Sequence, residues 1–78
     1  MVFDKLQQIL MKQFAVDEDA VTMDTSFVDD LGADSLDIAE FSMALEEEFD
    51  IPELGEDELN SLFTVRDVVG YISEKTGD

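Results

Sequence analysis

The chain has 78 residues, of which 21 are acidic and 4 are basic, so its formal net charge at pH 7 is −17. This charge repels phosphates and anionic bilayers and attracts basic proteins, so we expect no nucleic-acid binding. Hydrophobic residues make up 45%. That content is enough for the core of one small domain over residues 1–78, which we expect to be a monomer.

Several residue types are missing from the chain. It contains no cysteine and no histidine, which excludes disulfides, a thiolate nucleophile, the usual zinc ligands and the commonest general base. No run approaches the roughly 18 apolar residues of a membrane span. The first residues lack the charged and apolar regions of a signal peptide. We therefore expect a cytoplasmic protein that is not an enzyme and has neither a metal site nor a membrane span.

The first helix is predicted over residues 3–15, because apolar residues recur at helical spacing from Val2 to Phe14. The periodicity fails from Val16 to Ala33, where Asp, Thr, Ser and Gly accumulate around a few apolar residues. This pattern predicts a long loop that lies over the core. A loop of this length in a small domain is often functional.

A second helix is predicted to begin at Ser35, with Asp34 as its N-cap and Asp37 at the third helical position. Its apolar residues form two stripes. One stripe has the larger side chains and is expected to face the core (Ile38, Phe41, Leu45 and Phe49). The other lies among acidic residues and is a candidate docking surface (Leu36, Ala39 and Met43).

Pro52 is expected to end the second helix, since proline disfavours the helical conformation at the residue before it. A short helix is predicted over Glu56–Leu62, and a last helix between its N-cap Thr64 and Gly77. No segment shows the alternation typical of a strand. The sequence thus predicts an all-α fold, a small antiparallel bundle of three main helices plus one short helix, with a long first loop.

The segment that ends in Asp34-Ser35-Leu36-Asp37 is the candidate chemical site. Ser35 stands at the first helical position, beside backbone N–H groups that lack helical partners. These donors favour a phosphate, whereas Asp34 and Asp37 repel a free one. The pattern suits a phosphate attached covalently by an enzyme that neutralises the acids with a metal ion or basic groups. From spacing alone, a serine chosen for its preference for helix starts is the simpler interpretation.

A longer stretch of the sequence resembles a known family. Leu31-Gly32-Ala33-Asp34-Ser35-Leu36-Asp37, followed by Met43-Ala44-Leu45-Glu46-Glu47-Glu48-Phe49-Asp50-Ile51, closely resembles an acyl carrier protein of the discrete, type II kind that serves fatty acid synthesis. The resemblance covers essentially the whole chain. It implies that 4′-phosphopantetheine from coenzyme A is attached to Ser35 and that its thiol carries acyl chains as thioesters. The absence of cysteine agrees, because the working sulfur would arrive with the prosthetic group.

The resemblance also implies roles for other residues. Asp34 and Leu36 flank the attachment serine, and Asp34 helps to hold the metal ion used by the phosphopantetheinyl transferase (holo carrier synthase). Basic patches on that transferase, on fatty acid synthesis enzymes and on acyltransferases would contact Leu36, Asp37, Glu40, Met43, Glu47 and Glu48. The acyl chain would lie in a cavity lined by Phe27, Val28, Leu31, Phe41, Leu45, Leu59, Leu62 and Val68. The chain departs from the family at Phe41, where Leu is usual, and at Ser42, where an apolar residue is usual.

Other interpretations stay open at this point. The Asp-Ser-Leu motif is shared with carriers of polyketide and other specialised acyl pathways, although the acidic second helix favours fatty acid synthesis. A less favoured alternative is a non-catalytic acidic interaction module, which would leave the apolar strip beside Ser35 unexplained. Asp17-Glu18-Asp19 begins like a calcium-binding loop, but Thr22 stands where that loop needs glycine, so a solvated acidic loop is preferred.

Overall fold

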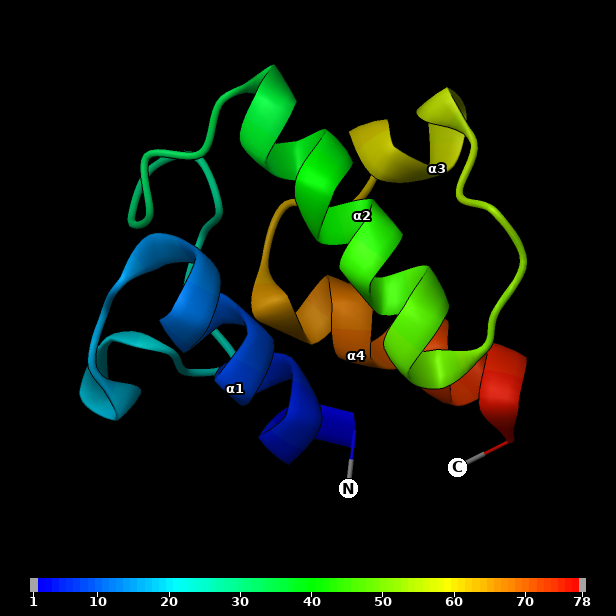
Figure 1. Ribbon diagram of the computed structural model, residues 1–78, viewed down its shortest axis with the longest axis horizontal. Helices are drawn as coiled ribbons and strands as arrows, with labels where there is room; N and C mark the ends of the chain where they lie inside the picture. The colour runs from blue at the N-terminus through cyan, green and yellow to red at the C-terminus, as the bar shows by residue number, and fades with distance from the viewer. Residues whose placement is uncertain (1, 78) are drawn as a thin grey trace.

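The computed structural model describes residues 2–77, so Met1 and Asp78, the ends of the predicted domain, lie outside the described residues. Across the described residues the helices are α1 (Val2–Phe14), α2 (Ser35–Phe49), α3 (Glu56–Asn60) and α4 (Val65–Thr76), as Figure 1 shows. One turn of 3-10 helix, η1 (Glu18–Ala20), interrupts the first loop. Residues 2–77 contain no strand. The prediction of an all-α fold with three main helices and a short one is confirmed.

The predicted first helix is shifted by one residue from α1, and the predicted ends of α2 and α3 differ by more. α2 ends at Phe49, before Pro52, because Asp50 adopts the left-handed conformation with φ 52°. A short polar side chain tolerates this conformation, which commonly closes a helix. α3 ends at Asn60, short of the predicted Leu62. After Asn60 the backbone hydrogen bonds join residues three apart, as in a 3-10 turn, and no longer residues four apart. The Ser61 N–H donates to the Glu58 carbonyl at 3.1 Å in this turn.

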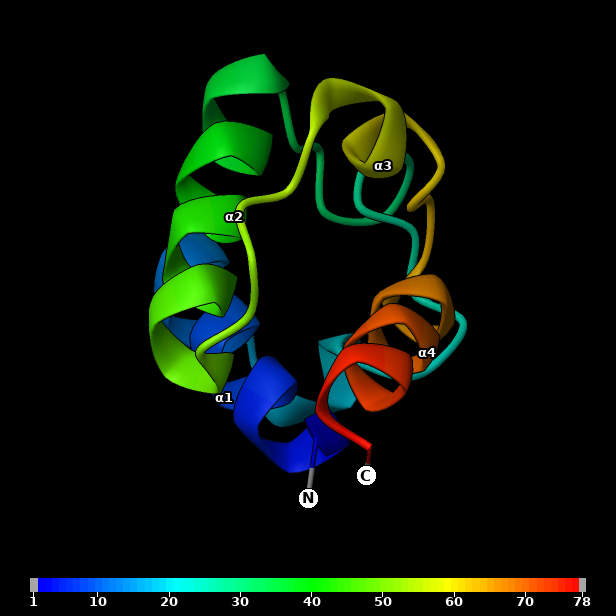
Figure 2. The same ribbon diagram turned by 90° about the vertical axis from the view of Figure 1, so that its right-hand side faces the viewer.

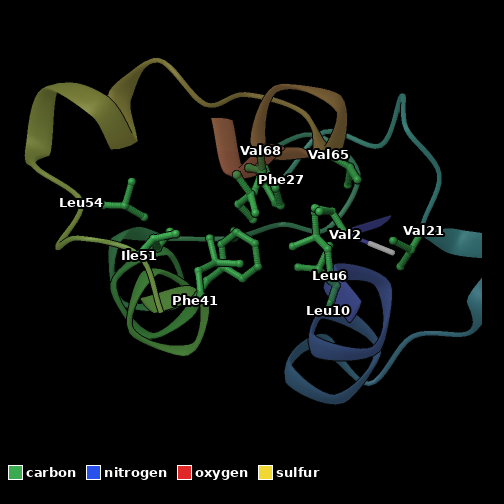
Figure 3. Close-up of a cluster of buried hydrophobic side chains, with 13 residues drawn as sticks. Val2, Leu6, Leu10, Val21, Phe27, Phe41, Ile51, Leu54, Val65 and Val68 are labelled. Atoms are coloured by element: carbon green, nitrogen blue, oxygen red, sulfur yellow. The ribbon is translucent and has the colours of Figure 1, made fainter. Parts of the chain in front are cut away.

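The core lies between α1, α2 and α4, with the first loop closing one side (Figure 3). α1 contributes Leu6 and Leu10, and α4 contributes Val65, Val68 and Ile72. From α2, Phe41 and Leu45 of the predicted core stripe are buried, whereas Ile38 and Phe49 are partly buried against them. Val21 and Phe27 of the first loop are also buried. The loop therefore covers the core, as its apolar residues predict.

Backbone hydrogen bonds hold the first loop to the start of α4. The Phe27 N–H donates to the Phe63 carbonyl at 3.1 Å, and the Val65 N–H donates to the Thr25 carbonyl at 3.0 Å. Arg66 adds an ion pair with Asp24 at 2.9 Å, but both side chains are exposed, so the pair contributes little stability. The loop thus has a fixed course although it is not helical over most of its length.

A side-chain pair ties α3 to α4. The Tyr71 hydroxyl donates to Glu58 Oε2 at 2.6 Å, and Glu58 Oε1 accepts from the Gly55 N–H at 3.2 Å. The bond to Glu58, followed by burial, raises the pKa of Tyr71 to about 12. The bond from Tyr71, followed by that from Gly55, holds the pKa of Glu58 below its ordinary value. Because a five-residue helix is too short to be stable alone, the position of α3 depends on such contacts.

Tyr71 is the single tyrosine of the chain, so its ionisation can be followed alone by the absorbance of tyrosinate. We expect a midpoint near 12 in the folded protein and a lower midpoint in Glu58→Gln. The folded pKa lies above the ordinary 10.0, so stability from this group is complete below about 10 and is lost as the pH rises to about 12. The Tyr71→Phe variant has no hydroxyl to ionise, so its free energy of unfolding should not show this contribution to the fall with pH. A wild-type midpoint near 10 would disprove the bond.

Candidate functional site

The start of α2, where Ser35 stands, lies at the same end of the molecule as α3 (Figures 1 and 2). Ser35 is the first residue of α2, and it is exposed. Asp34 is the N-cap: its Oδ1 accepts from the Asp37 N–H at 2.9 Å, and Asp37 Oδ2 accepts from the Asp34 N–H at 3.2 Å. This reciprocal capping box fixes where α2 begins and confirms the predicted cap.

A set of tight turns in the first loop directs the chain into α2. The Ala33 N–H donates to the Phe27 carbonyl at 2.8 Å, and the Gly32 N–H donates to the Val28 carbonyl at 3.1 Å. Gly32 has φ 67°, a conformation that favours glycine. An added Cβ at Gly32 would meet no atom within 4 Å, so the backbone conformation is what requires glycine there. Ser35 is therefore placed by the same loop that is bonded to α4.

Beside Ser35 is a mostly apolar hollow of about 830 Å³, open on one side, which we call the outer hollow. It is lined by Ser26, Phe27, Val28, Asp29, Ser35, Ile38, Ala39, Glu56, Leu59, Asn60, Leu62, Phe63 and Thr64. A second space of only about 10 Å³, the inner hollow, is lined by Phe27, Ile38, Phe41, Leu45, Leu59, Leu62 and Val68. The shared lining residues show that the inner hollow continues the outer one toward the core.

The structure brings all but one of the predicted cavity residues to these hollows. Phe27, Leu59 and Leu62 line both, Val28 lines the outer one, and Phe41, Leu45 and Val68 line the inner one. Leu31 lines neither: its N–H donates to the Ser26 carbonyl at 3.1 Å, and its side chain is partly buried against the core.

Sequence reasoning missed several lining residues. Ile38 lines both hollows, whereas the spacing of apolar residues predicts it only as part of the core stripe of α2. Its position one helical turn after Ser35 is the signal that could have placed it there. Ala39 was assigned to the docking strip and lines the outer hollow, as does Phe63. Phe63 is exposed despite its size.

The predicted docking residues separate into two groups. Leu36, Glu40, Met43 and Glu47 follow the spacing of one helix face, which we call the acidic face, and all of them are exposed. Leu36 is 65% exposed and Met43 is 63% exposed. Asp37 and Glu48 lie toward α1: the Asp37 carbonyl accepts from Gln13 Nε2 at 2.7 Å, and Glu48 lies 3.8 Å from Lys5 Nζ. The acidic face therefore joins large apolar side chains to carboxylates.

Residues 2–77 contain neither a membrane-spanning helix nor a cluster of metal-binding side chains. None of their helices combines the length and the apolar character needed to cross a bilayer. Within that same part of the chain, no three acidic side chains are arranged to hold a metal ion.

The surroundings of Ser35 fit a covalently attached phosphate. Among the described residues, neither its hydroxyl nor its backbone N–H has a hydrogen-bond partner, and the Leu36 N–H has none. These donors lie at the positive end of a helix of 15 residues, where anions are stabilised. The fold and the site together are those of a small helical domain with an exposed serine at a helix start, beside an apolar hollow.

Comparison with known proteins identifies the family. Residues 4–72 match the phosphopantetheine attachment site family. The chain is 51% identical over 75 residues to the acyl carrier protein of Clostridium perfringens strain 13, covering 96% of this chain and 97% of that one. It is 51% identical over 76 residues to the acyl carrier protein of Clostridium acetobutylicum, covering 97% of each chain. That of Bdellovibrio bacteriovorus is 47% identical over 74 residues, covering 95% of this chain and 94% of the relative.

The chain belongs to the acyl carrier protein family, as its sequence resemblance implied. It carries acyl chains on 4′-phosphopantetheine and is not an enzyme.

The capping role of Asp34 can be separated from any role in modification. Asp34→Ala should lower the free energy of unfolding by about 1 kcal/mol, because the N-cap bond to Asp37 is lost. Asp34→Asn should keep most of that stability, since asparagine caps about as well as aspartate. Asp29→Ala removes an exposed acid from the preceding loop and controls for the change in charge. Urea unfolding of the unmodified proteins measures all three, and equal stability of Asp34→Ala and wild type would contradict the capping role.

Proposed function

We propose that Ser35 is the attachment point of 4′-phosphopantetheine and that the protein carries growing acyl chains for fatty acid synthesis. One observation carries the proposal: the exposed Ser35 hydroxyl lies on the rim of the outer hollow, at the start of α2. A chain attached there has an apolar shelter within reach. The family match and the acidic face support the same function.

Each element of the site has a task in this mechanism. When bound, the prosthetic group supplies the thiol on which acyl chains are held as thioesters. The Ser35 and Leu36 N–H groups would stabilise the negative charge of a phosphodiester attached to Ser35. Asp34 holds the start of α2 in place through its cap and contributes to metal binding when the transferase is docked. Phe27, Ile38 and Leu59 line the hollow and exclude water from an apolar chain.

Partners are recognised at the acidic face. Its carboxylates Glu40 and Glu47 attract basic patches on the phosphopantetheinyl transferase, on fatty acid synthesis enzymes and on acyltransferases. Leu36 and Met43 then supply exposed apolar area that a partner can bury. Association guided by charge is fast and sensitive to salt, and modest affinity lets the carrier leave. The net charge of −17 opposes self-association, which supports a monomeric carrier domain over residues 1–78. We place this carrier in the cytoplasm, where its proposed partners in fatty acid synthesis would act.

The attachment site is tested by incubating the protein with coenzyme A and a phosphopantetheinyl transferase and measuring its intact mass. Wild type should gain one phosphopantetheine group, and Ser35→Ala should gain none. Ser61→Ala, which removes another exposed serine hydroxyl, should be modified like wild type. In cells that depend on this protein, Ser35→Ala should abolish fatty acid production. A mass gain in Ser35→Ala, or none in wild type, would refute the assignment.

The docking face is tested by reversing one charge. Glu47→Lys should slow association with the transferase several-fold at low salt, and the difference should shrink as salt screens the charges. Glu53→Lys changes the net charge equally at an exposed position outside α2, and should have a smaller effect. Stopped-flow association rates at several ionic strengths make the comparison. If the two variants slow association equally, the net charge and not the acidic face guides docking.

A further inference from the structure

The space available to an acyl chain narrows sharply with depth. The outer hollow next to Ser35 measures about 830 Å³, whereas the inner hollow behind it measures about 10 Å³. Phe27, Ile38, Leu59 and Leu62 line both. A space of about 10 Å³ holds no more than one water-sized group. A chain that enters from Ser35 is therefore free to extend only as far as the inner hollow.

Two aromatic rings close the path at this depth. Phe27 and Phe41 have ring centroids 5.1 Å apart and planes tilted by 45°, a favourable arrangement for an aromatic pair. Phe27 is 2% exposed and Phe41 is 3% exposed. Figure 3 shows Phe27, Phe41 and Val68 pointing toward one another from the first loop, α2 and α4. The rings form a packed layer between the hollows and the rest of the core.

We infer that Phe41, packed against Phe27, is the floor of the acyl site and sets the longest acyl chain that the protein shelters. The inference rests on the proposed attachment at Ser35. A short chain occupies the outer hollow without disturbing the core. A longer chain must separate Phe41 from Phe27 or leave its end in water. Each methylene left in water lowers the equilibrium constant for burying the chain by about four-fold, relative to a chain that is fully buried.

Phe41, and not Phe27, is the residue that can be varied to test this. Phe27 lines both hollows, and its backbone bonds to Phe63 and Ala33 fix the loop before Ser35. A change at Phe27 would alter the depth of the site and the placement of the attachment point together. Phe41 lines only the inner hollow and lies in the middle of α2. A change from Phe41 to leucine therefore alters the depth of the site without touching the loop that positions Ser35, and it keeps a large apolar side chain in the core.

The test uses the full chain in its phosphopantetheinylated form, loaded enzymatically with saturated acyl chains from butanoyl to hexadecanoyl in two-carbon steps. Two quantities are measured for each chain: the rise in Tm over the unacylated form, and the rate at which hydroxylamine cleaves the thioester. In wild type, protection should increase with chain length up to a limit. Phe41→Leu should move that limit to longer chains by at least one step.

Two further variants sharpen the comparison. Val68→Leu enlarges a residue that lines the inner hollow from α4, so it should move the limit to shorter chains. If circular dichroism shows that Phe41→Leu does not fold, the shift of the limit in Val68→Leu tests the inference by itself. Phe14→Leu changes a partly buried phenylalanine that lines neither hollow, so its limit should match wild type.

The outcomes are distinguishable. Shifts in opposite directions for Phe41→Leu and Val68→Leu support the inference. An unchanged limit in folded Phe41→Leu and Val68→Leu overturns it, even though acyl chains are still protected. If acyl chains load on Ser35 but none is protected at any length, the proposed shelter fails and the inference falls with it. If nothing loads on Ser35, the proposed attachment itself is refuted.

Discussion

The backbone pairing between the first loop and the start of α4 holds the functional site together. It joins Thr25 and Phe27 to Val65 and Phe63, segments far apart in the chain. Phe27 links this pairing to the site, because its carbonyl accepts from the Ala33 N–H, just before α2, and Phe27 lines both hollows. Ser35, the proposed attachment point, and the hollows beside it are thus positioned by one short stretch of backbone. Buried backbone bonds of this kind are costly to lose, because their groups would be left without partners.

Outside this pairing, several features lower the stability of the fold: repulsion between like charges, exposed apolar side chains and a very short α3. A charge of −17 on a small body repels itself, and large apolar side chains such as Leu36 and Met43 remain exposed. α3 has five residues and is held to α4 through the bond between Glu58 and Tyr71. Few contacts allow a segment to open at a low free-energy cost. Since residues of α3 line the outer hollow, the shortest of the four α-helices in residues 2–77 lies beside the proposed acyl site.

Local signals account for most of what the sequence predicted correctly. The caps Asp34 and Thr64 were predicted because a side chain that bonds a helix N-terminus acts within a few residues, and the resemblance to a known family drew attention to Ser35. The positions that could not be predicted depend on contacts between distant segments. Asp50 ends α2 in a left-handed conformation that its residue type permits but does not require. Leu31 lies in a loop that is bonded to the start of α4, so the spacing of residues along the chain could not show that Leu31 lines neither hollow.

The two departures from the family pattern have different consequences in the folded protein. Ser42 is buried, but its hydroxyl donates to the Ala39 carbonyl of its own helix at 2.8 Å, and it lines neither hollow. Its polar group is therefore satisfied within α2. Phe41 extends from the same helix to meet Phe27 and so joins the layer that limits the depth of the site. The ring stabilises the core of the empty protein, and the same packing must be disrupted before a long chain can be sheltered. A smaller residue at position 41 would therefore make room for a longer acyl chain but would lower the stability of the protein without a chain.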